Sequence, residues 1–439
     1  MEFENLPEGW VYESIGNYFD IQSGYAFKSS DFIDKGIPVI KIKNITPPTV
    51  SLEDIQYVGK DVLGNKTQFN VNYKDILISM TGSNVHQMSS AVGKVSRLQE
   101  KNKLFLLNQR VGKFVLTKPE QMDYDFLYYL VSTYDTQYEL ASNASGSANQ
   151  ANINPSMIKS LKRLLPPLPQ QQKIASILGA LDDKIELNNQ MNQTLETMAK
   201  ALFKSWFVDF EPFADGEFEE SELGMIPKGW KIIPLEELLI DTKSGDWGKD
   251  NQQDKYNSEA YCIRGADINS LRNGQLVDLQ LRYLKDSTFT KKLLDTRNII
   301  IEISGGSPTQ STGRPLFVNE KLLTVYDKPI TSTNFCRILM TKPLVSELLY
   351  LKWVMMYDDK LFFNYENGTT GIKNLDLKAI LSNEKIALPN DDVISEFQQI
   401  VSNFFAKIIQ NGIESRSLIS IRDALLPKLM SGEISLEEI

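Results

Sequence analysis

The sequence predicts an α+β protein made of two similar mixed α/β globular domains, each followed by one long helix. Three observations predict this fold class. Motifs return with a period of about 220 residues. Short β-rich runs are bounded by Gly, Asn and Pro, and two long stretches show apolar residues at alternating steps of four and three. We therefore expect globular domains over residues 1–165 and 213–388, and helical spacers within 166–212 and 389–439.

The repeat is visible in motifs that return in the same order. Residues 6–10, 75–82 and 126–130 return as residues 226–230, 298–305 and 348–352. The offset stays between 220 and 223 residues, which is far too long for a solenoid repeat. This pattern indicates a duplicated domain.

Each half begins with strand-like runs and ends at prolines. Residues 37–42, 76–80, 114–117 and 299–304 are predicted strands, because they are apolar and flanked by turn residues. Pro166, Pro167 and Pro169 then end the first globule, and Leu388-Pro389 ends the second, since proline lacks an N–H and fixes φ.

The stretches after these prolines have heptad spacing. Apolar residues recur from Ile174 to Trp206 and again from Phe397 to Leu425, with Asn188 and Asn411 near the middle of each seam. Each helix would be about 38 residues, or about 57 Å, long. A single helix of this kind often packs into a core, but two equivalent ones favour a pair that holds two globules at a fixed distance.

Charge and composition are those of an ordinary globular chain with one basic region. The net charge is −9, yet residues 21–119 carry 14 basic and 7 acidic side chains, while residues 166–225 carry 4 and 11. No apolar run reaches the length of a membrane span, and the acidic start does not resemble a signal peptide. With only Cys262 and Cys336 present, we expect a reducing, cytoplasmic location.

Motifs of common enzymes are missing from the sequence. His86 is the only histidine, no G-x-S-x-G or P-loop occurs, and the Pro-Pro pairs lack the flanking residues that amino-methyltransferases use. The triplet Asp241-Thr242-Lys243 matches a nuclease D-x-K, but a match this short is expected by chance. We expect no catalytic centre, no metal and no cofactor in this chain.

Four stretches, taken together and in this order, resemble one known family. They are residues 166–174 (PPLPQQQKI), 201–210 (ALFKSWFVDF), 224–230 (GMIPKGW) and 425–434 (LLPKLMSGEI). The chain resembles the DNA specificity subunits of type I restriction–modification systems over its whole length. It departs from the family at Gln170, where a glutamate is common.

The resemblance implies a role for each part. Each globule would be a target recognition domain that reads one half of a split double-stranded DNA site. The two helices would pair as an antiparallel coiled coil that sets the gap and binds two methyltransferase subunits. Those subunits would use S-adenosylmethionine to methylate adenine N6, and two motor-nuclease subunits, using ATP and Mg²⁺, can join for cleavage.

Two alternatives remain open at this point. The chain could be a duplicated coiled-coil scaffold that does not bind nucleic acid, and the salt dependence of binding to duplex DNA in the presence of the methyltransferase would separate the two functions. It could also be an enzyme in its own right, which would require methyl transfer or strand cleavage by the purified chain.

The candidate DNA-reading residues are cations, amides and small residues in polar loops, because such groups contact base edges and phosphates. Ordinary solvated loops have a similar composition. In the first domain the candidates are Lys41, Lys43, Ser79, Thr81, Gly82, Ser83, Asn84, His86, Gln87, Lys94, Arg110, Ser145, Gly146, Ser147, Asn149 and Gln150. In the second they are Arg264, Ser304, Gly305, Gly306, Ser307, Thr309, Gln310, Arg314, Gly368, Thr369, Thr370 and Lys373.

Some apolar residues of the two long helices lie outside the predicted seam between them, and these are candidates for partner binding. They are Ile177, Met191, Met198, Phe203, Phe405 and Ile421.

Overall fold

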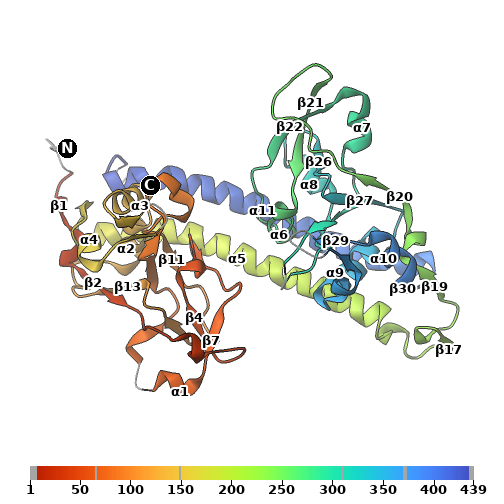
Figure 1. Cartoon of the computed structure of the whole chain (residues 1–439), viewed down its shortest axis with the longest axis horizontal. Coiled ribbons are helices and arrows are strands. Elements are labelled where there is room, and N and C mark those ends of the chain that lie inside the picture. The colour runs from red at the N-terminus through yellow and green to blue at the C-terminus, as the bar shows by residue number, and fades with distance from the viewer. Residues whose placement is uncertain (1–6, 65–66, 148–149, 308–309, 369–372, 435–439) are drawn as a thin grey trace. The chain divides into compact units, whose positions relative to one another are not determined.

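The computed structural model describes residues 7–64, 67–147, 150–307, 310–368 and 373–434 (Figure 1). The chain forms two compact units. The first comprises residues 1–181 and 421–439, and the second comprises residues 182–420. Helix α5 (Leu168–Phe207) begins in the first unit and ends in the second, and α11 (Asp391–Ser431) does the reverse.

The first unit is built on two main sheets. One has the strand order β2-β13-β9-β11-β6-β5, and the other has the order β3-β7-β4-β12-β8. The strands are β1 (Val11–Ser14), β2 (Phe19–Ser23), β3 (Phe32–Ile33), β4 (Ile37–Ile40), β5 (Ile45–Thr46), β6 (Thr49–Val50), β7 (Gln56–Val58), β8 (Asn70–Val71), β9 (Ile76–Ser79), β10 (Thr81–Gly82), β11 (Val95–Arg97), β12 (Phe105–Leu107), β13 (Val111–Leu116), β14 (Ser145–Ser147), β15 (Gln150–Asn152) and β16 (Lys162–Leu165). The helices besides α5 are α1 (Lys60–Leu63), α2 (Tyr124–Val131), α3 (Tyr134–Ser142) and α4 (Pro155–Lys159).

The hydrophobic core of the first unit contains residues of the globule and of one end of each long helix. Ile76 and Ile78 of β9 are fully buried and lie in one cluster with Phe126 of α2. Ile174 of α5 and Leu429 of α11 belong to the same cluster. Burial on both faces explains why β9 reads as a continuous apolar run rather than as an alternating one.

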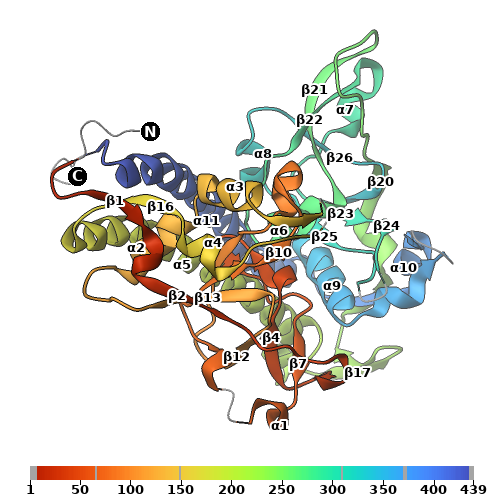
Figure 2. The ribbon, with the colours of Figure 1, turned by 60° about the vertical axis from the view of Figure 1, so that its left-hand side comes forward.

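The second unit repeats the plan with a four-stranded sheet, β20-β27-β23-β25, and a three-stranded sheet, β22-β21-β26. Its strands are β17 (Phe218–Ser221), β18 (Gly224–Pro227), β19 (Lys231–Pro234), β20 (Leu239–Ser244), β21 (Tyr256–Ile263), β22 (Gln280–Lys285), β23 (Asn298–Glu302), β24 (Ser304–Gly305), β25 (Pro315–Phe317), β26 (Ile330–Ser332), β27 (Cys336–Thr341), β28 (Glu366–Asn367), β29 (Lys373–Leu375) and β30 (Lys385–Leu388). Its short helices are α6 (Ile268–Arg272), α7 (Phe289–Lys292), α8 (Glu320–Thr324), α9 (Ser346–Asp358) and α10 (Leu377–Asn383). Figure 2 shows α9 beside β23 and β25.

The register of the sheets confirms the predicted duplication. In the first unit, antiparallel β13 and β9 align Val111 with Ser79. In the second, antiparallel β27 and β23 align Cys336 with Glu302. Residues of the two units can therefore be matched one to one across these strands.

The two long helices pair antiparallel, as the resemblance implies. Asn188 donates to the hydroxyl of Ser415 at 3.2 Å, and Asn411 donates to Oδ1 of Asn192 at 2.8 Å. As the residue number increases along α5, the residue number of the partner on α11 therefore decreases. Both seam asparagines are buried, so their amides tie the two helices together in one register. Helix α5 begins at Leu168 and includes Pro169, because proline is tolerated in the first turn of a helix.

Within the described residues, no helix is long and apolar enough to cross a membrane.

Candidate nucleic-acid interface

The two polar loops predicted in each globule come together in one small sheet. In the first unit, β10 pairs with β15, which pairs with β14. Thr81 lies opposite Asn152, and its hydroxyl donates to the Asn152 side chain at 2.9 Å. In the second unit, β24 pairs with β29 and β29 with β28, with Ser304 opposite Asn374. Segments about 70 residues apart thus form one polar surface in each unit.

A cation directly follows an equivalent strand in each unit. Lys41 directly follows β4, and Arg264 directly follows β21. Each stands at the start of a short 3-10 helix, and its backbone N–H donates to a side-chain oxygen three residues later, of Asn44 at 3.0 Å and of Asp267 at 2.9 Å. The backbone therefore presents these two side chains in the same way.

Lys41 is partly engaged within the first unit. Its ammonium group donates to Gln56 and lies 3.6 Å from the centroid of the Phe32 ring. Burial lowers the pKa of Lys41, and the nearby charge of Lys43 lowers it further. Lys43 and Arg110 are exposed, and Lys94 is half-buried. Within the ranges that the structure describes, no ion pair is formed by these three side chains.

The loop after β9 separates into a buried and an exposed part. Ser79 is buried, and its hydroxyl accepts the Lys94 N–H at 3.1 Å, so the prediction that Ser79 reaches DNA is wrong. Ser83 is also buried, and its hydroxyl lies 2.7 Å from that of Ser90. His86 and Gln87 are exposed. Of the other candidates, Thr81, Gly82 and Asn84 are half-buried, and Ser145, Gly146, Ser147 and Gln150 are exposed.

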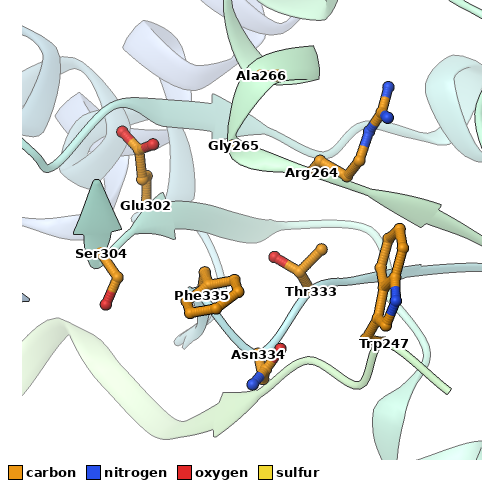
Figure 3. A pocket seen from close by; sticks show the side chains of 9 residues that line it. All are labelled: Trp247, Arg264, Gly265, Ala266, Glu302, Ser304, Thr333, Asn334 and Phe335. Carbon is orange, nitrogen blue, oxygen red and sulfur yellow. The ribbon is translucent and has the colours of Figure 1, made fainter. Parts of the chain in front are cut away.

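A cavity of about 360 Å³ gathers several candidates of the second unit (Figure 3). It is lined by Trp247, Arg264, Gly265, Ala266, Glu302, Ser304, Thr333, Asn334 and Phe335. Four separate segments meet here, namely the stretch after β20 that holds Trp247, the ends of β21 and β23, and the turn before β27. The cavity combines two aromatic rings with donors and acceptors, which suits a partner that has flat or apolar groups next to polar edges.

Arg314 is engaged in an internal ion pair. Its guanidinium donates to both carboxylate oxygens of Glu302, at 2.7 and 2.5 Å, and Glu302 is buried. The hydrogen bond to Glu302 raises the pKa of Arg314. Arg314 thus has a structural ion pair with Glu302, and its contact with DNA stays a prediction.

We expect Arg314→Met to destabilise the protein by roughly 3–5 kcal/mol, because it leaves a buried carboxylate without its partner. Thermal unfolding would measure the loss. The matched control is Arg416→Met, which removes an exposed ion pair to Asp278 and should cost about 1 kcal/mol or less. Equal effects of the two substitutions would contradict the structural role of Arg314.

The remaining candidates of the second unit are held by local contacts. Lys373 pairs with Glu366 at 2.6 Å. Burial opposes ionisation of Glu366, but hydrogen bonds from Lys373 and Thr312 outweigh it and lower the pKa of Glu366. Gly305, Gly306, Ser307 and Gln310 are half-buried, and Gly368 is exposed. Asn149, Thr309, Thr369 and Thr370 lie outside the described residues.

Known proteins share this sequence and architecture. The model of the type I restriction modification DNA specificity domain matches residues 7–197. The MjaIX specificity subunit of Methanocaldococcus jannaschii is 29% identical over 94% of this chain and 97% of its own length. The HindI specificity subunit of Haemophilus influenzae is 28% identical over 71% of this chain and 77% of its own. Residues 7–197 thus match the type I restriction modification DNA specificity domain, and the chain is similar to type I specificity subunits over most of its length.

A solved structure shares the fold of this chain. The type I restriction-modification S subunit from M. genitalium matches with a TM-score of 0.53 over 98% of each chain, at 18% identity.

The six candidate partner residues differ sharply in exposure. Phe203 and Phe405 are buried in the core of the second unit, so their assignment to a partner surface is wrong. Ile177 and Met191 are half-buried. Met198 and Ile421 are 48% and 49% exposed, and only these two of the six offer a largely accessible apolar side chain.

Sequence reasoning missed the aromatic residues of the cavity, Trp247 and Phe335. Phe335 is 54% exposed although it stands in a turn between two buried strands. The match of Phe335 with Arg110 comes from the sheet register, because their offset of 225 residues lies outside the 220 to 223 of the sequence repeat.

Proposed function

We propose that this chain is a type I specificity subunit that reads a split double-stranded DNA site, with the globular part of each unit reading one half. One observation carries the proposal. Each unit repeats two features: a cation directly follows an equivalent strand (Lys41 or Arg264), and two distant loops form a small polar sheet. Two similar surfaces in one chain suit two separate half-sites. Lysines, arginines and amides can supply both phosphate and base-edge contacts.

The chemistry of modification then belongs to other subunits. We assign adenine methylation with S-adenosylmethionine to two methyltransferase subunits that bind α5 and α11. ATP- and Mg²⁺-dependent cleavage would belong to motor-nuclease subunits, where these are present. The specificity subunit contributes selection of the site and its geometry and is not itself catalytic.

The proposal predicts that the two halves are read independently. Replacing residues 1–165 with the matching region of a related specificity subunit should change one half-site and leave the other unchanged, because each globule has its own core. The measurement is a genome-wide map of modified adenines in a host that expresses the chimera with its methyltransferase. A change in both half-sites would contradict the two-domain assignment.

The alternative is a scaffold that does not bind nucleic acid. The salt dependence of DNA binding tests it. Binding of duplex DNA by the complex should weaken steeply between 50 and 200 mM salt, because phosphate contacts release counterions. Binding that is absent, or insensitive to salt, would favour the scaffold.

A further inference from the structure

The turn that carries Phe335 is rigid, and it places an apolar ring where a polar residue would be expected. The Cys336 N–H donates to the Thr333 carbonyl at 3.1 Å, which closes the turn. The Phe335 carbonyl accepts a hydrogen bond from the Ile303 N–H at 2.9 Å. The Thr333 N–H donates to the Ile263 carbonyl at 2.9 Å. The backbone is thus fixed to two neighbouring strands while the ring is 54% exposed.

Trp247, on the opposite side of the cavity, is also held in place by contacts within the protein. The Arg282 guanidinium lies 4.1 Å from the centroid of the Trp247 ring, and its Nε donates to the Trp247 carbonyl at 2.8 Å. Arg282 pairs in turn with Asp250. Figure 3 shows Trp247 and Phe335 on either side of Thr333, with Arg264 near Trp247. A ligand would therefore meet a fixed apolar wall and, beside it, the guanidinium of Arg264, which is held in place by its ion pair with Asp267.

The first unit holds an arginine at the position of Phe335. Val111 N–H donates to the Asn108 carbonyl at 2.9 Å, and Met80 N–H donates to the Arg110 carbonyl at 2.9 Å. These are the bonds made around Phe335, with Val111 in place of Cys336. The same backbone support thus presents a guanidinium in one unit and an aromatic ring in the other.

We propose that this turn position selects one base in each half-site: Phe335 contacts the 5-methyl group of a thymine, and Arg110 donates to a guanine. The inference rests on the proposed function, since it requires that each unit reads DNA in the major groove. There, thymine alone presents a methyl group, which suits an apolar side chain, and guanine presents the O6 and N7 acceptors that suit arginine. The two half-sites should therefore differ at corresponding positions.

The test uses the specificity subunit in complex with its methyltransferase and the DNA site found by mapping modified adenines. Each thymine of the half-site read by the second unit is replaced in turn by deoxyuridine, which lacks only the methyl group. At one position, wild-type affinity should fall about fourfold, the effect of one buried methyl group. Phe335→Ala should bind thymine and deoxyuridine equally at that position. Ile240→Ala, an exposed apolar residue on β20, is the control and should keep the wild-type difference.

A second variant tests the exchange of roles. Phe335→Arg should shift the preference at the same position from thymine to guanine, measured by binding to the four base pairs. The inference is overturned if Phe335→Ala still distinguishes thymine from deoxyuridine as the wild type does. It is also overturned if the second half-site contains no thymine. Either result can occur while the exchange of residues 1–165 still changes a single half-site, so failure here is distinguishable from failure of the proposed function.

Discussion

Under the proposed assembly with two methyltransferase subunits, replacing Met198 with glutamate is expected to remove one of them, and replacing both Met198 and Ile421 is expected to remove both. These residues are 223 positions apart, the same offset that relates Asn188 to Asn411. They are therefore equivalent residues of the duplicated helices. Two copies of one partner need two similar surfaces, and this pair of exposed apolar side chains provides an equivalent point of contact in each unit.

The expected loss of affinity is large because the lost burial of an apolar side chain and the cost of burying a charged one add together. Burial of a methionine or isoleucine side chain in an interface contributes about 1.5–3 kcal/mol, and a glutamate in its place must also lose its hydration. Affinity at the altered surface should fall by at least about 10- to 100-fold. The fold should persist, since exposed substitutions usually change stability by about 0.5 kcal/mol or less.

Size-exclusion chromatography with light scattering would count the bound methyltransferases. Leu187→Glu is the matched control, because Leu187 is 51% exposed on α5 but its equivalent in the repeat is the polar Gln410. This control should still bind two subunits. A double variant of Met198 and Ile421 that also binds two would refute the assignment.

The features that the sequence predicted well are those set by local pattern. The repeat, the buried run of β9 and the heptad seams each follow from spacing along the chain, and the buried pairing of Asn188 with α11 agrees with the seam position of its amide. The polar loops were also located correctly as segments.

The features that were missed depend on partners distant in sequence. Nothing near Arg314 in the chain shows that Glu302 would accept both of its donors, or that the Ser79 hydroxyl would turn inward to the Lys94 N–H. Phe203 and Phe405 have helical spacing that fits an exposed stripe, but the globule of the second unit packs over them. Phe335 could be recognised only once sheet register aligned it with Arg110.

Lengthening both long helices together should lengthen the gap between the two half-sites. The insertion points are chosen from contacts within the second unit. Four residues between Asp183 and Lys184 in α5, and four between Ser417 and Leu418 in α11, keep the Lys184–Glu414 and Asn188–Ser415 contacts on one side. Because the helices are antiparallel, the added turns can pair with each other. Each adds about 6 Å at 1.5 Å per residue.

The expected result is a gap that is one or two base pairs longer, with both half-sites unchanged, because DNA advances about 3.4 Å per base pair. Four residues make slightly more than one helical turn, so the apolar seam keeps nearly the same face and a coiled coil can absorb the change as a stutter. Insertions of two residues at the same points turn the apolar face by about 200° and should abolish binding to any split site. Mapping of modified adenines reads out the gap directly. If the four-residue variant modifies DNA with the original gap, the helix pair does not set the distance, and the spacing must be determined by the partner subunits.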